Sequence, residues 1–262
     1  MGNKKDRNQI ALVTGASSGM GRCFVRQITE QYPSLHEIWV IARRRERLEK
    51  LSEELPETKL RILALDLSEK ASFAALAERL AQIRPCVRLL VNAAGLGHSG
   101  SVKDQDPDGI SDTLDVNCRA LMAVTRICLP YLERGSRIIQ LASGSAFAPQ
   151  PGFAVYAASK ACVLSFSRAL REELRPEGVC VTAVCPGPVR TEFFRTGGIA
   201  LSPFKKLFLA DPDKVVRRAL SDAARGRALS VYGMSMKLFR LMTGILPQGA
   251  AVRLGRMLLL KK

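Results

Sequence analysis

The chain has 262 residues, 47% of them hydrophobic and 24% charged, which is enough to bury the core of one α/β domain. Its seven scattered cysteines form no CxxC pair and its two histidines are too few for a histidine-based metal site, so we expect reduced thiols, no metal and a cytoplasmic location. The polar N-terminus and the lack of a long apolar run argue against a signal peptide or a membrane-spanning helix. A formal net charge of +16 favours anionic partners.

Short β-branched runs alternate with longer helical patterns along most of the chain. We expect strands at residues 10–14, 37–42, 60–65, 88–92, 137–142 and 179–184, and helices at about 19–31, 45–55, 68–83, 108–131 and 153–175, with weaker helical segments in 200–225. Buried strands separated by helices predict a doubly wound parallel sheet with helices on both faces, in a single domain over 1–262. Ligands bind such sheets outside the carboxyl ends of the strands.

A glycine-rich turn links the first expected strand to the first expected helix. Residues 14–21 read TGASSGMG, and Gly15, Gly19 and Gly21 allow a tight turn and close approach of the backbone to a pyrophosphate at a helix N-terminus. The spacing is TGxxxGxG rather than GxGxxG, so the motif gains weight from its place between a strand and a helix. We therefore expect a dinucleotide-binding site.

The end of the second expected strand indicates which dinucleotide is bound. A site for NAD usually places an Asp or Glu there, whereas this chain has Ala42, followed by Arg43, Arg44 and Arg45. A guanidinium binds phosphate through two parallel hydrogen bonds. We therefore expect NADP(H) as the cofactor, with Arg43 bound to its 2′-phosphate. Arg44 and Arg45 are interpreted as the solvated start of the next helix.

Ser143, Tyr156 and Lys160 form a candidate catalytic set. Tyr156 and Lys160 stand four residues apart, so they share one face of the helix that starts after the break at 149–152. A free phenol has a pKa of about 10 and is a poor acid–base catalyst at neutral pH. A neighbouring ammonium and a helix N-terminus both favour the phenolate, and Ser143 can hydrogen-bond the same substrate oxygen.

From residue 10 to about 191 these motifs, in this order, resemble those of the short-chain dehydrogenase/reductase family. The turn at 14–21 resembles the family's nucleotide-binding turn, residues 66–67 its adenine-contacting acidic pair, 92–95 the motif beside the cofactor, and 186–191 the segment that holds the nicotinamide carboxamide. The resemblance implies a catalytic set of Asn117, Ser143, Tyr156 and Lys160, in which Asn117 holds a proton-relay water near the lysine. It implies cofactor contacts from Gly15, Ser17, Ser18, Gly19, Met20, Gly21, Arg43, Asp66, Leu67, Asn92, Ala93, Gly95, Tyr156, Lys160, Pro186, Gly187, Val189 and Thr191.

The implied reaction is hydride transfer between NADP(H) and a carbonyl or secondary alcohol, with Tyr156 as proton donor, Ser143 fixing the oxygen and Lys160 holding the ribose. The expected pocket is aromatic, which favours a small hydrophobic ketone, steroid-like or acyl-chain, over a sugar. Its phenylalanines are Phe147, Phe153, Phe193, Phe194 and Phe204. Residues 192–225 are expected to form a substrate lid with a hinge at Gly197 and Gly198.

Other functions stay open at this point. The same fold can serve as a nucleotide-binding regulatory or scaffold protein, although the presence of both Tyr156 and Lys160 favours an enzyme. A 3-oxoacyl-thioester reductase is another alternative. Nucleic-acid binding is not expected, because the arginines are dispersed and no aromatic side chains interleave with them.

Residues 231–262 form a basic, apolar C-terminal extension. Many family members end instead in a glycine-rich strand that completes a tetramer, and this extension is similar to that of hydroxysteroid-dehydrogenase-like members. We expect it to pack against the body near the pocket or against a partner in a homo-oligomer, with a dimer favoured. Contact with an anionic membrane is the less favoured alternative, because apolar stripes at helical spacing usually belong to a core.

Overall fold

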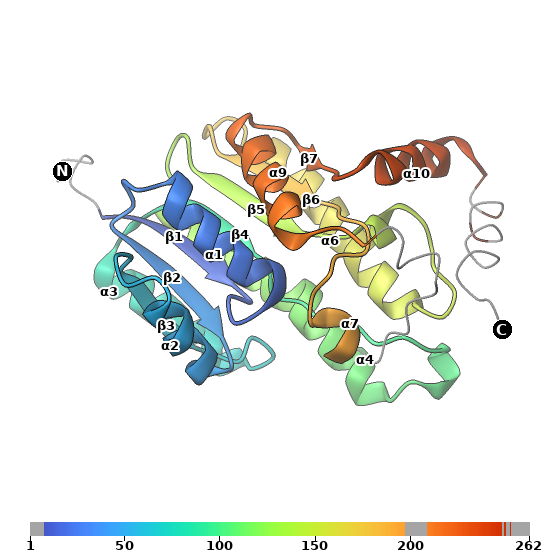
Figure 1. Ribbon diagram of the computed structural model, residues 1–262, viewed down its shortest axis with the longest axis horizontal. Helices are drawn as coiled ribbons and strands as arrows, with labels where there is room; N and C mark the ends of the chain where they lie inside the picture. Colours follow the sequence, from blue (N-terminus) through green and yellow to red (C-terminus); the bar gives the residue numbers. More distant parts are fainter. Residues whose placement is uncertain (1–7, 197–208, 248, 250–251, 253–262) are drawn as a thin grey trace.

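The computed structural model describes residues 8–196, 209–247, 249 and 252. Seven parallel strands form one sheet in the order β3-β2-β1-β4-β5-β6-β7 (Figure 1). The strands are β1 (Gln9–Thr14), β2 (Glu37–Ala42), β3 (Leu60–Ala64), β4 (Cys86–Asn92), β5 (Arg137–Leu141), β6 (Cys180–Val184) and β7 (Leu229–Ser230). This arrangement confirms the predicted doubly wound parallel sheet.

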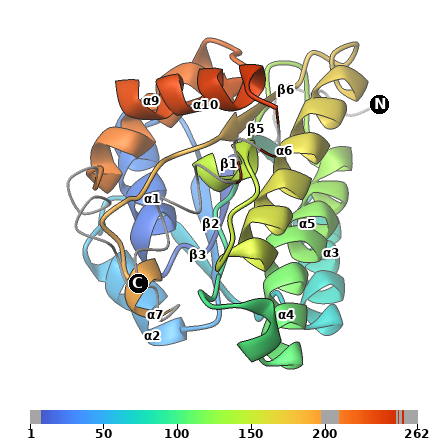
Figure 2. The same ribbon diagram turned by 90° about the vertical axis from the view of Figure 1, so that its right-hand side faces the viewer.

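Helices cover both faces of the sheet, as Figure 2 shows. On one face lie α1 (Gly19–Gln31), α2 (Arg45–Glu53) and α9 (Pro212–Ala224), and on the other lie α3 (Lys70–Ile83), α5 (Leu121–Cys128) and α6 (Ala154–Glu173). The remaining segments are η2 (Val102–Asp104), α4 (Pro107–Leu114), the π-helix η3 (Asp115–Ala120), η4 (Leu129–Tyr131), η5 (Gly144–Phe147), α7 (Phe193–Thr196) and α10 (Met234–Ile245).

The central strand β1 shows why the strands read as continuous apolar runs. Ala11 and Val13 belong to the hydrophobic cluster under α1 and α9, whereas Ile10 and Leu12 belong to the cluster under α3, α5 and α6. All four are fully buried, because helices cover both faces of a parallel sheet. This packing on both faces holds the strands in place, so the carboxyl ends of neighbouring strands keep fixed positions relative to one another.

The region after β6 differs from the sequence prediction in two respects. The short strand β7 was not predicted; it pairs with Ala183 and Val184 of β6. The predicted lid at 192–225 includes α9, whose Val216 and Leu220 are fully buried against the sheet and α1. Residues 212–224 are therefore core, and the lid prediction remains for the residues before them. Its hinge at Gly197 and Gly198, and Phe204, lie outside the described residues.

Part of the C-terminal extension forms the helix α10. It packs next to η5, but none of its residues is buried. The expectation that its apolar side chains pack onto the body is therefore wrong for the outward-facing ones, among them Leu238 and Leu241. No helix in the described part of the chain has the length and apolar character needed to cross a membrane.

Candidate active site

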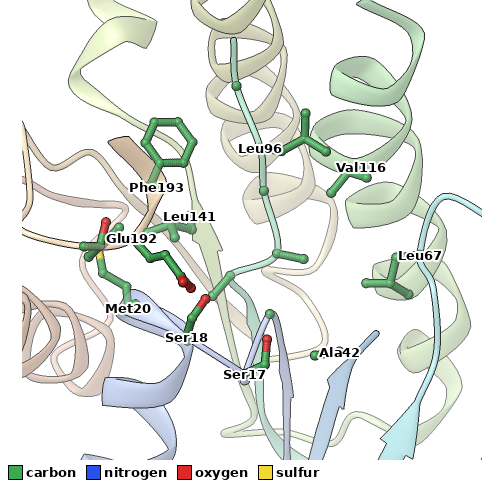
Figure 3. A pocket seen from close by; sticks show the side chains of 18 of the residues that line it. Ser17, Ser18, Met20, Ala42, Leu67, Leu96, Val116, Leu141, Glu192 and Phe193 are labelled. Carbon is green, nitrogen blue, oxygen red and sulfur yellow. The ribbon is translucent and has the colours of Figure 1, made fainter. Parts of the chain in front are cut away.

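A cavity of about 480 Å³ lies at the carboxyl ends of the strands (Figure 3). Its walls come from the segments that directly follow β1 to β6, as expected for a ligand site on a doubly wound sheet. Most of the residues predicted to contact the cofactor line it: Gly15, Ser17, Ser18, Gly19, Met20, Gly21, Arg43, Asp66, Leu67, Ala93, Gly95, Tyr156, Lys160, Pro186, Gly187, Val189 and Thr191. Ser143 lines the same cavity.

The glycine-rich turn packs so closely against other backbone atoms that side chains at Gly15 and Gly21 would not fit. Gly15 has a φ of +68°, and a Cβ there would lie 2.7 Å from the backbone nitrogen of Ala94. A Cβ on Gly21 would lie 2.6 Å from the carbonyl carbon of Gly15. Ser18 is the N-cap of α1, and its side chain makes no capping hydrogen bond to the helix. Ser18, Gly19, Met20 and Gly21 line the cavity, so the N-terminus of α1 lies at its wall, where a helix end can bind an anionic group.

Thr14 joins this turn to the loop after β4. Its Oγ1 accepts hydrogen bonds from the backbone N–H groups of Ala93 and Ala94, both at 3.1 Å. Those bonds fix the two loops that form the floor of the cavity. Thr14 itself is 1% exposed, so its role is to position the backbone rather than to contact a ligand.

Arg44 was interpreted as a solvated helix start, and the structure shows that this was wrong. Its guanidinium donates hydrogen bonds to Ser17 Oγ at 3.2 Å and Ser18 Oγ at 3.1 Å, and it lines the cavity. Glu192 holds it from the other side, with an oxygen 3.5 Å away. Arg45 pairs with Glu49 on its own helix, at 3.7 Å, as a solvated position would.

Arg43, the residue predicted to hold a 2′-phosphate, lies beside Asp66. The two side chains form an ion pair at 3.6 Å, and the side chain of Arg43 is 67% exposed. Burial acts to raise the pKa of Asp66, but hydrogen bonds from Ser68 and the charge of Arg43 outweigh it, so this pKa lies below its usual value. Arg43 and Arg44 together place two guanidinium groups at the end of β2.

Glu192 ties the segment after β6 to the start of α2. It accepts hydrogen bonds from Arg47 at 2.7 and 3.3 Å in addition to its contact with Arg44. Figure 3 shows Glu192 at the rim of the cavity. The sequence placed Glu192 at the start of the expected lid, but no motif indicated its ion pairs with Arg44 and Arg47.

Asn92 does not line the cavity, although it was predicted to contact the cofactor. Its side chain is 2% exposed and donates hydrogen bonds to Thr125 Oγ1 and Gln140 Oε1, both at 3.0 Å. This buried amide network joins β4, β5 and α5. Asn92 therefore supports the wall of the site from behind.

Ser143 and Tyr156 converge at the edge of the cavity. Tyr156 is the third residue of α6 and is 9% exposed, and its hydroxyl lies next to Ser143, the residue two after the end of β5. Burial raises the pKa of Tyr156 to about 12, and the Ser143 contact offsets this only in part. This direction is opposite to the expected shift toward the phenolate, because the loss of solvent outweighs the contact with Ser143.

Lys160 lies next to Tyr156 but points toward the backbone. Its Nζ lies 5.7 Å from the centroid of the Tyr156 ring and donates a hydrogen bond of 2.8 Å to the Leu141 carbonyl. Burial lowers its pKa to about 8, because a charged amine loses its hydration there. The amine is therefore close to its titration range at neutral pH.

Asn117 lies in the π-helix η3, behind the wall of the cavity. It is fully buried, donates to the Leu96 carbonyl at 2.8 Å and Ser159 Oγ at 2.9 Å, and accepts from the Leu96 N–H at 2.9 Å. A Cβ on Gly95 would lie 3.1 Å from Asn117 Oδ1 and 3.3 Å from Lys160 Nζ, so both groups come close to the same backbone. The extra residue of a π-helix commonly re-aims a side chain at a functional site. The relay water remains a prediction.

Aromatic rings cover Tyr156. Phe153 stacks on it with centroids 4.4 Å apart, and Phe193 lies 5.3 Å away at a tilt of 49°. Phe194 contacts Phe193 edge-on at 5.7 Å and also lines the cavity. Phe147 differs from the prediction, since it packs on the hydrophobic cluster beneath α10 and lines a separate cavity.

The parallel sheet, the glycine-rich turn and the buried Tyr–Lys pair together define a dinucleotide-binding oxidoreductase. The family model for short chain dehydrogenases matches residues 9–198. The chain belongs to this family, which confirms the resemblance found in the sequence.

The chain is also similar to two named relatives and to one solved structure. The chain is 37% identical over 198 residues to sulfoacetaldehyde reductase 2 of Chromohalobacter salexigens, which covers 73% of this chain and 77% of that protein. It is 36% identical over 193 residues to the NADP-dependent 3-hydroxy acid dehydrogenase YdfG of Escherichia coli K12, covering 70% and 74%. A short-chain dehydrogenase from Sphingobium yanoikuyae in complex with NADPH superposes with a TM-score of 0.77 at 28% identity, covering 97% and 96%.

Proposed function

We propose that this protein is an NADPH-dependent reductase of small hydrophobic ketones, and of the corresponding secondary alcohols in reverse. The observation that carries the proposal is the buried pair of Ser143 and Tyr156 at the edge of the nucleotide cavity, with Lys160 beside the ring. Phe193 and Phe194 line the cavity next to Tyr156, and these two rings support an apolar substrate over a sugar.

The residues at the glycine-rich turn and the end of β2 fit a dinucleotide that carries a 2′-phosphate. Gly15 and Gly21 allow the tight turn that brings this backbone to the wall of the cavity, where a pyrophosphate would lie. Ala42 supplies no carboxylate for a ribose 2′-hydroxyl, whereas Arg43 and Arg44 line the cavity there. The NADP named for the Escherichia coli relative and the NADPH bound in the Sphingobium structure agree with this choice.

Tyr156, Ser143 and Lys160 have different roles in the proposed proton transfer. A bound nicotinamide dinucleotide supplies the hydride. Tyr156 holds its proton at Oη because burial raises its pKa, and it donates this proton to the substrate oxygen during reduction. Ser143 hydrogen-bonds the same oxygen, which fixes its position and stabilises the developing negative charge. The ammonium of Lys160, held by the Leu141 carbonyl, stabilises the tyrosinate left behind.

A second substrate class is a 3-oxo acid or its thioester. Likeness to a 3-hydroxy acid dehydrogenase favours it, because oxidation of a 3-hydroxy acid at C3 gives a 3-oxo acid. The two classes differ in charge, so they are readily separated by assay. The homodimer and the cytoplasmic location expected from the sequence stay predictions.

The test is an activity screen with purified protein and NADPH. Ketosteroids, aliphatic ketones and 3-oxoacyl thioesters are compared by the loss of NADPH absorbance, with Tyr156→Phe as the matched control for background oxidation. We expect turnover of an apolar ketone that the variant lacks. Turnover restricted to 3-oxoacyl thioesters would move the assignment to the second class. If no carbonyl were reduced although NADPH bound, the reductase proposal would be refuted in favour of a regulatory protein.

A further inference from the structure

The helix α10 presents an apolar stripe to the outside of the molecule. Met234, Leu238, Leu241 and Ile245 are 77%, 57%, 60% and 74% exposed, and Met242 beside them is 39% exposed. Their spacing of three and four residues places them on one side of the helix. In Figure 1, α10 extends beyond the rest of the body at the upper right. Large exposed side chains gathered in this way mark an interaction surface.

The opposite side of α10 anchors it to the enzyme. Met236 reaches into the space left by two glycines, because a Cβ on Gly187 would lie 2.8 Å from its sulfur and Gly144 is in similarly close contact. Met236, Phe239 and Thr243 are half-buried on this side. The helix is therefore seated on the body with its more apolar stripe directed outward.

Positive charge lies alongside the stripe. Arg168 of α6 and Lys237 and Arg240 of α10 line a second cavity, together with Leu241 and Ile245 of the stripe. Among the described residues, none of these three cations has a carboxylate within ion-pair distance. The sequence has no Asp or Glu after Asp222, and that residue is paired with Arg218 and Arg227.

We propose that α10 docks on the surface of a bilayer rich in anionic lipid. The helix has twelve residues, or about 18 Å, too short to cross a bilayer but suited to lying in its interface. The stripe enters the boundary of the acyl chains, and Lys237, Arg240 and Arg168 contact headgroup phosphates. A second copy fits less well, because a two-fold contact would bring the cations of both copies into one interface, and none of them has a carboxylate partner among the described residues.

Flotation with vesicles tests this proposal. Purified protein is mixed with vesicles of phosphatidylcholine alone or with about 30 mol% phosphatidylglycerol, at about 0.15 M and about 1 M salt. The double variants Leu238→Glu/Leu241→Glu and Lys237→Glu/Arg240→Glu remove the apolar and the charged component. Val102→Glu is the matched control, since Val102 is 51% exposed but lies in η2. Thermal unfolding and light scattering of each variant establish its fold and its oligomeric state.

We expect binding to the anionic vesicles at least about tenfold stronger than to phosphatidylcholine, and weaker at high salt. Either double variant is expected to lose at least about tenfold in partitioning, whereas Val102→Glu binds as wild type. Equal binding to both vesicle types, or unchanged binding by the Leu238/Leu241 variant, overturns the proposal. So does a variant that changes from dimer to monomer while wild type ignores vesicles, because the stripe would then join two copies.

Discussion

Replacing Arg44 by alanine is expected to weaken the use of NADPH much more than the use of NADH. Arg44 is held by the hydroxyls of Ser17 and Ser18 at the glycine-rich turn, so its guanidinium is already oriented toward the site proposed for the 2′-phosphate. NADH lacks that phosphate and therefore makes no such contact. The rim should survive the change, because Arg47 still binds Glu192.

The expected loss of binding free energy in each variant follows from the solvent exposure of the arginine side chain that is removed. The side chain of Arg44 is 40% exposed, so a charge-assisted contact there is partly screened and should be worth about 2 kcal/mol, or roughly 30-fold in kcat/KM. Arg43 is 67% exposed, so its contact is more strongly screened by solvent, which suggests about 1 kcal/mol, or roughly fivefold. Arg45 pairs with Glu49 and should contribute nothing.

The assay measures kcat/KM for both cofactors at saturating carbonyl substrate, in wild type and in Arg43→Ala, Arg44→Ala and Arg45→Ala. Arg45→Ala is the matched control, because it removes the same side chain one residue further along α2. We expect the ratio of kcat/KM for NADPH to kcat/KM for NADH to fall most in Arg44→Ala and less in Arg43→Ala. In Arg45→Ala the ratio should stay as in wild type. A ratio unchanged by Arg44→Ala, or lost equally for both cofactors, would refute the assignment of a phosphate-binding role.

Three further changes probe the chemistry and the core. Tyr156→Phe should lower kcat by roughly 10²–10⁴-fold, while NADPH affinity in a fluorescence titration stays within about twofold; a smaller loss of kcat would assign the proton donor elsewhere. Lys160 has a lowered pKa of about 8 and loses its charge as the pH rises, so kcat/KM for reduction should decline above about pH 8; a plateau to pH 10 contradicts this role. Leu220→Ala should reduce the free energy of unfolding by about 2–5 kcal/mol in denaturant titrations, whereas Leu114→Ala, at a 43% exposed leucine, should change it by less than about 0.5 kcal/mol. Equal effects of the two leucine variants would mean that α9 is not part of the core and belongs to the predicted lid.

Local pattern was enough to predict the strands, the glycine-rich turn and the Tyr156–Lys160 pair. Each depends on spacing along one element, since buried strands show as apolar runs and residues four apart share a helix face. The π-helix at Asn117 was not predicted, because its sequence has the same apolar period as an ordinary helix. The same holds for β7, whose two residues give too short a pattern.

Contacts between distant segments explain what the sequence did not reveal. Arg44 and Glu192 are 148 residues apart, and nothing in the run of three arginines distinguishes the one that faces the cavity. The raised pKa of Tyr156 depends on how completely the surrounding chain excludes water, which no local motif records. The outward stripe of α10 reads in sequence like any buried helix face, and only its docking through Met236 shows which side is exposed.

The strand order also determines when each strand can join the sheet as the chain emerges from the ribosome. β1 pairs with β2 and β4, so a half-sheet of β3-β2-β1-β4 can assemble once residues 9–92 have emerged. Its β4 edge then stays open until β5 arrives, after α4 and α5 have been made. An open strand edge of this kind can pair with other chains, so this interval is the stage of synthesis at which the nascent protein is most exposed to aggregation.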